Sequence, residues 1–289
     1  MQPLLNPKLD IIFKQLFTTD LEILLNLVNA VLQFPSDKRI QSVEVKNPTI
    51  LPEMVNEKYI ILDIRAVDNH QHQYDIEMQV QEYQYYPERT VYYLSRLYAG
   101  QLEAGEQYFQ LKPVIGIHFL DDELFSKHPE YHFCFELRDV RYPNLRLTDQ
   151  FALHMFELPK FERCTRPEQW GGDIFEWLHF FNHAKEEGDE AMRIQYKNPA
   201  VHKAFSVLER LSSDEEACYL AQMREDALRN EATQLAAAKE EGREEGRLIG
   251  AICTLQEVLK QPVSPEEDLA QKGIEELREM LRILKAKIQ

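Results

Sequence analysis

The stretch ILDIRAVDNHQHQYDIEMQVQ, residues 61–81, contains two runs of alternating apolar and polar residues with a polar segment between them. Such alternation places successive side chains on opposite faces of a β-strand. The connecting segment DNHQHQ opens with Asp68 and Asn69, which are typical turn residues. The sequence therefore predicts two strands, over residues 58–67 and 74–81, joined by a short polar turn.

The two predicted strands carry carboxylates on the same face. If the turn centres near His70, antiparallel pairing sets Asp63 opposite Glu77. The same register sets Arg65 opposite Asp75. The second pair is attractive, whereas two carboxylates directly opposite each other destabilise a sheet. A register slip of one residue would separate the two acids.

Two interpretations explain why a strand pair would hold Asp63 against Glu77. In the first, one carboxyl is protonated, or the polar face is wet enough to screen the repulsion. In the second, a divalent cation lies between them; Mg²⁺ prefers oxygen ligands and retains water and substrate phosphate in its shell. The spacing is compatible with both and by itself favours the first, because polar outer faces of hairpins are common.

Helical and strand patterns alternate around this strand pair. The order helix, three strands, helix and further strands predicts an α/β fold with a mixed sheet. The expected elements are one or two helices over residues 8–33 with a break near 18–20, a strand near 40–45, the two strands above, a helix over 86–108, and strands over 113–122, 131–140 and 151–161.

The pattern after Phe161 is helical. Gly242, Gly246 and Gly250 recur at four-residue spacing, and each costs about 1 kcal/mol in a helix interior. This part of the helix is therefore expected either to fray or to pack closely against a partner. We expect an α/β domain over residues 1–162, a helical region over 163–230 and a helical tail over 231–289 suited to homodimer formation. A solvated, charged tail without a partner explains the pattern equally well.

The composition sets limits on the class of protein. The chain has 289 residues, of which 44% are hydrophobic, so it can bury a sizeable core. Its net charge of −16 argues against a protein that coats DNA, although about two thirds of the acidic excess lies after residue 120. The four cysteines lack metal-ligand spacing, and no signal peptide or membrane-spanning run is evident. We therefore expect a cytoplasmic protein with reduced thiols and no membrane partner.

Several blocks of the sequence together resemble the Rpn family of recombination-promoting nucleases, which are also described as transposases and belong to the PD-(D/E)XK nuclease superfamily. The resemblance implies a restriction-endonuclease-like core, in the order helix, three-stranded meander, helix and strand, with an α-helical C-terminal extension. The blocks are NPKLDIIFKQLF (6–17), ILDIRA (61–66), YDIEMQVQ (74–81), YYPERTVYYLSRLYAGQLEAGEQYFQLKPVIGIHFLD (85–121), HMFELPKF (154–161) and EEGREEGRLIG (240–250).

The resemblance also implies roles for individual residues. Asp63 and Glu77 would bind Mg²⁺, or Mn²⁺ in its place, and Asp10 would supply a further ligand. Gln79 stands where the superfamily more often has a catalytic lysine; its amide can orient water but cannot act as a charged base. Lys14 is a candidate for the compensating positive charge, with a plain surface lysine as the alternative.

The helix expected after the strand pair carries candidate DNA contacts. Arg89 and Arg96 lie seven residues apart, on roughly one face, with Tyr93 between them. Arginines in such a position contact phosphates, and tyrosines stack on bases. In the alternative interpretation, the tyrosine is partly in the core and the arginines are solvated.

The resemblance therefore implies a Mg²⁺-dependent DNA endonuclease linked to recombination or mobile elements. Two alternatives remain open at this point. The first is a weakly active or inactive nuclease-fold protein that recruits partners, which the acidic charge and Gln79 favour. The second is a DNA-strand transferase. The residues themselves indicate only a site for a metal-dependent hydrolase.

Overall fold

The computed structural model describes residues 3–50, 60–61, 63–81, 84–164, 172–187 and 190–287. The chain forms two compact units, Met1–Glu225 and Asp226–Gln289, and the helix α7 (Glu215–Val258) continues from the first into the second. Each unit is described by itself. The finer division predicted at residues 162 and 230 stays a prediction.

The first unit contains a six-stranded mixed sheet in the order β1-β4-β5-β6-β8-β7. β1, β4 and β5 form an antiparallel meander, β5, β6 and β8 run parallel, and β7 is antiparallel to β8. The strands are β1 Val43–Lys46, β4 Ile64–Asp68, β5 Gln73–Gln79, β6 Val114–Leu120, β7 His132–Glu136 and β8 Phe151–Glu157, with β2 Thr49–Ile50 and β3 Ile60–Ile61 as a separate pair.

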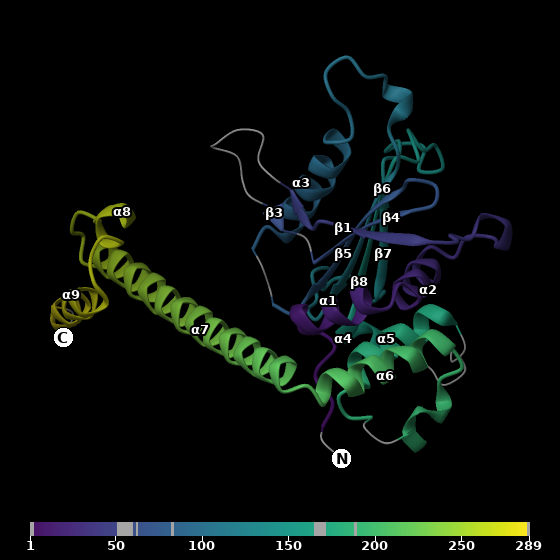
Figure 1. Cartoon of the computed structure of the whole chain (residues 1–289). Helices are drawn as coiled ribbons and strands as arrows, with labels where there is room; N and C mark the ends of the chain where they lie inside the picture. Colours follow the sequence, from purple (N-terminus) through teal and green to yellow (C-terminus); the bar gives the residue numbers. More distant parts are fainter. Residues whose placement is uncertain are drawn as a thin grey trace. The chain divides into compact units, whose positions relative to one another are not determined.

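Helices cover both faces of the sheet (Figure 1). On one face Phe119 of β6 packs against Phe13 of α1 and Phe181 of α5, with ring centres 6.3 and 4.9 Å apart. On the other face, Leu94 and Leu97 of α3 belong to a core cluster with side chains of β6 and β8. The helices of this unit, with short 3₁₀ turns, are α1 Asp10–Thr19, α2 Leu21–Leu32, η1 Ser36–Lys38, α3 Tyr86–Ala99, η2 Tyr108–Gln110, α4 Leu158–Cys164, α5 Asp173–His183, η4 Glu190–Gln195, α6 Pro199–Ser212 and the start of α7.

The predicted fold is confirmed. A helical segment precedes the meander, α3 follows it, and β6 joins the sheet next to β5. The predicted break in the first helical segment lies at Asp20, whose side chain accepts a hydrogen bond from the Glu22 N–H at 2.9 Å and so starts α2. The side-chain cap explains why one apolar run forms two helices.

One predicted element is different. The pattern over residues 58–67 predicts a single strand, but β3 pairs with β2, the chain bends at Asp63, and β4 begins at Ile64. Residues 58, 59 and 62 lie outside the described residues. The bend occurs because Asp63 makes hydrogen bonds to β5 that involve a side chain, in place of the regular backbone ladder.

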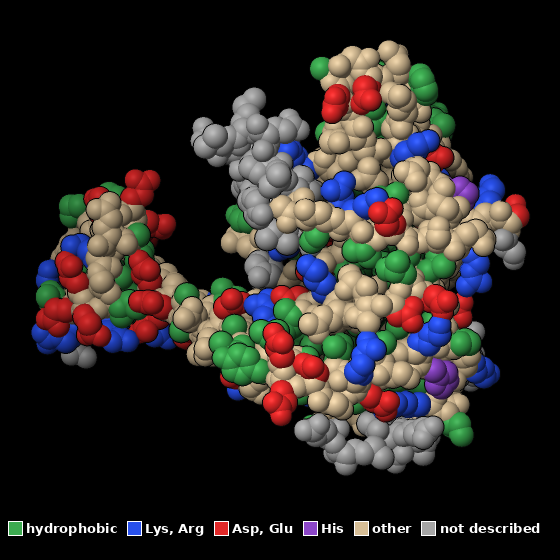
Figure 2. Space-filling model, in the orientation of Figure 1, with side chains coloured by type: hydrophobic (Ala, Val, Ile, Leu, Met, Phe, Trp, Pro, Cys, Tyr) green, Lys and Arg blue, Asp and Glu red, His purple; other side chains and the backbone are tan. Residues whose placement is uncertain are grey.

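The second unit is helical and has a small core of its own. α8 (Glu266–Leu269) and α9 (Ile274–Ala286) pack on the end of α7, and Leu248, Ile252 and Leu277 are buried between them. Arg278 of α9 pairs with Glu244 of α7 at 2.6 Å. Figure 2 shows acidic and basic side chains interspersed on the surface of this unit. Within the described ranges, no helix combines the length and the apolar character that crossing a bilayer requires.

Candidate metal centre

β4 and β5 pair in the predicted register, with Arg65 opposite Asp75. Just before β4, the Asp63 N–H donates to Glu77 Oε1 at 3.1 Å. In return, the Met78 N–H donates to Asp63 Oδ2 at 3.0 Å. Each carboxylate is thus held by the backbone of the opposite strand. The structure therefore brings together the two acids that the sequence predicts to meet.

Asp75 adds a third carboxyl group to this region. It lies two residues before Glu77 and so shares its face of β5. The side chain is fully buried, and neither oxygen has a geometrically well-formed hydrogen bond among the described residues. His118 Nε2 lies 3.5 Å from Asp75 Oδ2. Because a buried polar group without a good partner is costly, Asp75 indicates a local function.

His118 and Tyr86 form the wall behind the carboxyls. His118 lies next to Glu77 in the parallel β5–β6 register, and Tyr86 Oη is 2.7 Å from His118 Nδ1. Burial lowers the pKa of His118 to about 4 and raises the pKa of Tyr86. The tyrosine hydroxyl therefore stays protonated and donates to Nδ1, which leaves the imidazole proton on Nε2, facing Asp75.

α3 brings a positive charge to the carboxyls. Arg89 Nη2 lies 3.6 Å from Glu77 Oε2, and its guanidinium carbon is 5.1 Å from the ring centre of Tyr93. The charge of Glu77 raises the pKa of Arg89 against the opposing effect of burial, so the guanidinium stays charged. Arg96 lies two helical turns further on, on the same side of α3, and is half-exposed. Arg89 and Tyr93 are therefore at the site, and Arg96 extends the same side of the helix.

Burial and mutual repulsion make these carboxyls hard to ionise together. Burial, with the charge of Asp10 in addition, raises the pKa of Asp63 to about 6 despite the opposing Met78 hydrogen bond. Burial and then the charge of Asp63 raise the pKa of Asp75 to about 7. The pKa of Glu77 is also raised well above its usual value, first by burial and then by its two acidic neighbours. A nearby cation would relieve this repulsion.

Asp10 lies beside this group. It occupies the first turn of α1, and its charge adds to the raised pKa of Asp63. Its carboxylate is not free, because Arg224 Nε donates to Asp10 Oδ1 at 3.0 Å. Any contact of Asp10 with a bound metal therefore competes with this arginine.

Lys14 and Gln79 make fewer contacts with Asp63 and Glu77 than the residues described above. Lys14 is exposed on α1, one turn beyond Asp10. Gln79 ends β5 on the same face as Glu77, is half-exposed, and donates through Nε2 to the Gln81 carbonyl at 3.1 Å. Within the described part of the chain, no hydrogen bond links either side chain to the two principal acids.

The donor set fits a hard divalent cation. Carboxylate oxygens are the ligands that Mg²⁺ prefers, and it commonly takes one or two of them plus water and substrate phosphate. Asp63 and Glu77 supply two such groups, and the buried Asp75 carboxyl lies beside Glu77 on the same face of β5. Across the described ranges, no three His, Cys, Asp or Glu side chains form a ready-made metal cluster. Water and substrate would therefore have to complete the coordination shell.

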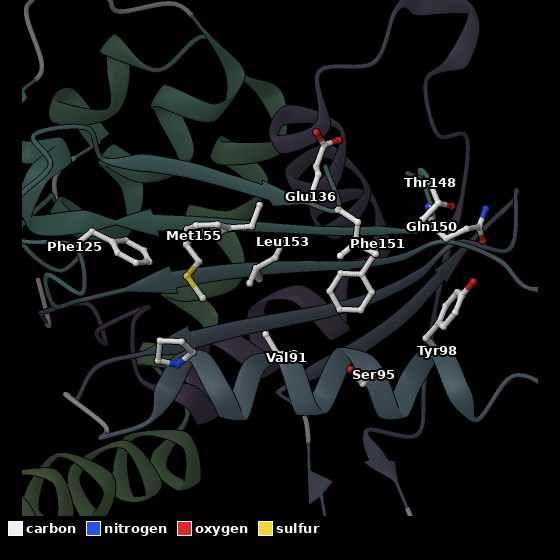
Figure 3. A pocket seen from close by; sticks show the side chains of 13 residues that line it. Val91, Ser95, Tyr98, Phe125, Glu136, Thr148, Gln150, Phe151, Leu153 and Met155 are labelled. Atoms are coloured by element: carbon white, nitrogen blue, oxygen red, sulfur yellow. The ribbon is translucent and has the colours of Figure 1, made fainter. Parts of the chain in front are cut away.

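A separate apolar cleft of about 580 Å³ lies on the other side of α3 (Figure 3). Val91 and Ser95 face it from the helix, and Leu153 and Met155 face it from β8. Glu136 is the one ionisable acid or base, apart from the tyrosine hydroxyl, among its described lining residues. The group of carboxyls that includes Glu77 therefore lies outside this cleft, on the β5 side of the helix.

Sequence reasoning missed three members of the site. Asp75 was expected to form an ion pair with Arg65, but the structure has no ion pair between them. The sequence gives His118 no role. It places Tyr86 either at the entrance of the site or over the sheet edge, whereas the structure has Tyr86 buried against His118. The available signal is a histidine inside VIGIHFL, a run that is otherwise apolar and fully buried. A polar residue in such a strand needs a partner, which here is Tyr86.

The comparisons with known proteins give one match. The family model described as PD-(D/E)XK nuclease family transposase matches residues 7–238, well over half of the chain. No curated protein and no solved structure matches the chain significantly. The matched region includes the whole sheet and every residue of the candidate metal centre.

Proposed function

This chain belongs to the PD-(D/E)XK nuclease family transposases, and we propose that it is a Mg²⁺-dependent DNA endonuclease centred on Asp63 and Glu77. The observation that carries the proposal is the convergence of these carboxylates. They come from adjacent segments, and a hydrogen bond holds each carboxylate to the backbone of the other segment. Arg89 lies beside Glu77, and the chain belongs to a family described as nucleases.

The residues of the chain have separate tasks in this reaction. A bound divalent cation would lower the pKa of the attacking water and act as a Lewis acid for the phosphate. Asp63 and Glu77 hold the ion, and the Met78 N–H fixes the orientation of Asp63. Arg89 offsets negative charge that develops on the phosphate. The Gln79 amide, at the end of the same strand, orients the attacking water.

Substrate binding is assigned to the side chains around this centre. Arg89 and Arg96 follow one side of α3, and Tyr93 lies between them as a surface on which a base can stack. Lys14, exposed on α1 one turn beyond Asp10, adds positive charge. The substrate is a DNA phosphodiester, and its sequence preference is set by contacts beyond these.

Nicking of supercoiled plasmid in Mg²⁺ tests the proposal. The wild type is expected to nick the plasmid, and chelation to stop it. Asp63→Asn and Glu77→Gln should each lower the rate by about a hundredfold or more, because a metal contact contributes several kcal/mol to the transition state. Glu88→Gln, at an exposed acid on α3, is the matched control and should cut normally. Full activity of both site variants would rule out this centre.

The family description also includes transposases, so strand transfer is the second candidate. A labelled oligonucleotide with a free 3′-hydroxyl, added to the same assay, reports joining as well as cutting. Joined products that depend on Glu77 would favour the transferase. Metal-dependent nicking without joining favours the hydrolase. A wild type that binds DNA but neither cuts nor joins would favour a recruiting protein with a nuclease fold.

A further inference from the structure

A second cleft, of about 560 Å³, is lined in part by residues of β1, β4 and the start of β5. Three cations line it: Lys46 at the end of β1, Arg65 on β4, and Lys112 just before β6. Five Asn or Gln side chains complete most of the wall, and no Asp or Glu is among the described lining residues. In a chain with a net charge of −16, such a concentration of positive charge and amide donors is unexpected.

Arg65 is held toward this cleft. Although it lies opposite Asp75 in the strand register, its Nη2 donates to Gln73 Oε1 at 3.3 Å instead. Its Nε is buried and has no hydrogen-bond partner among the described residues. An anion in the cleft would supply the missing acceptor.

The opposite wall is also fixed. The Gln101 amide, after the end of α3, donates to the Lys112 carbonyl at 3.0 Å and accepts from the Lys112 N–H at 2.8 Å. This double contact holds the backbone of Lys112 beside the end of α3. Lys46 pairs with the exposed Glu44 at 2.6 Å. A surface ion pair of this kind is worth little, so a phosphate can compete for the lysine.

The cleft and the metal centre share one face of β5. Gln73 lines the cleft and Glu77 lies four residues further along the same strand, on the same side. Four residues of strand span about 13 Å. Neighbouring phosphates of one DNA strand are separated by about 3.4 Å along the helix axis and also by rotation around it, so this separation corresponds to a few nucleotides at most.

We propose that the cleft lined by Lys46, Arg65 and Lys112 binds a backbone phosphate of the DNA substrate, a few nucleotides from the bond that is cut. The cations match a phosphate, and the amides add donors for its oxygens or for a base edge. This inference rests on the proposed function, because its ligand is the strand that the metal centre would cleave. It adds a subsite that sets the register of the DNA.

The test measures DNA binding by the 289-residue protein without metal. Fluorescence anisotropy of a labelled DNA gives the affinity at salt concentrations from about 50 to about 300 mM. Lys46→Ala with Lys112→Ala should lower the salt slope by about one or two and weaken binding about tenfold near physiological salt. Lys38→Ala, at an exposed lysine outside the cleft, is the matched control and should behave like the wild type.

A neutral phosphate scan locates the contact. Methylphosphonate is placed at one position at a time in an oligonucleotide whose cut site has been mapped. In the wild type, affinity should fall for a modification at one position within a few nucleotides of the cut. In the double lysine variant the same modification should have no further effect.

The outcomes separate the two proposals. Suppose that the wild type binds and cuts DNA, and that the double variant has the wild-type affinity, salt slope and methylphosphonate profile. The proposed subsite is then wrong, and the proposed nuclease activity is unaffected. If the wild type neither binds nor cuts DNA, both proposals fail. Loss of binding by the double variant with an unchanged unfolding temperature supports the subsite.

Discussion

At the scale of single residues, the feature that most needs explanation is the group of three buried carboxyls. Asp63 and Glu77 are held by backbone N–H groups, but Asp75 has no such donor. The pKa values of all three side chains are raised. Without a cation, the carboxyls therefore retain protons at a higher pH than usual, which reduces their mutual repulsion. A bound divalent cation would relieve the same repulsion.

Asp75→Asn tests this account through pH. Because the folded pKa of Asp75 is raised to about 7, the folded protein keeps a proton that the unfolded chain loses above about pH 4. Stability in chelator should therefore fall as pH rises from about 4 to about 7. Thermal unfolding should show this decline in the wild type and a shallower one in the variant, whose amide does not titrate.

The slope with pH, rather than the absolute melting temperature, is the measure for this variant. A buried amide without a partner costs about 1–3 kcal/mol at every pH, so the variant is expected to start from a lower value. Asp37→Asn, at an exposed acid, should leave the slope unchanged. An identical slope in wild type and Asp75→Asn would contradict the assignment of a proton to Asp75.

The sequence could predict the pairing of Asp63 with Glu77 because strand alternation and a turn near His70 are local properties. It could not predict that Arg65 turns away from Asp75, since that depends on Gln73 and on the cleft beyond it. Nor could it place His118 beside these acids. That contact depends on β6 joining β5 in parallel, after a crossover through α3.

At the scale of elements, α3 has two different sides. One carries Arg89 and Tyr93 toward the carboxyls, and the other carries Val91 and Ser95 toward the apolar cleft. A helix can do this because positions three or four apart share a side while intermediate positions point elsewhere. The sequence predicted the helix and its arginines, but the separation of its two sides required the position of the sheet.

Gly246→Ala tests the glycine series of α7. A Cβ added at Gly246 meets no atom within 4 Å, and the residue is exposed within the helix. Alanine should therefore stabilise the second unit by about 1 kcal/mol through helix propensity alone, as measured by urea unfolding followed by circular dichroism. Gly116→Ala is the opposite case: its Cβ would lie 2.7 Å from Leu153 Cδ1, and a loss of about 1–3 kcal/mol is expected.

Gly246→Ala also tests homodimer formation through the tail. This homodimer stays a proposal. Leu269, Leu277 and Leu284 are buried inside the second unit rather than left for a partner. If a second copy packs on the glycine side of α7, Gly246→Ala should lower the mass found by light scattering. A variant that is more stable and unchanged in mass would show that these glycines make no such contact.

At the scale of the whole molecule, the order of elements and the family were predictable because both depend on patterns that extend over most of the chain. The fold and the match over residues 7–238 agree with that expectation. The limits of prediction were local. The bend at Asp63 replaces part of an expected strand with side-chain hydrogen bonds, which alternation of apolar residues cannot reveal.

The central claim is that Asp63, just before β4, and Glu77, on β5, bind one divalent ion. A crystal structure of the protein with Mn²⁺, read from its anomalous signal, tests this most directly. The account predicts an ion about 2.1 Å from oxygens of Asp63 and Glu77, absent from crystals of Glu77→Gln. An ion bound elsewhere, or the two carboxylates turned to opposite faces of the sheet, would contradict it.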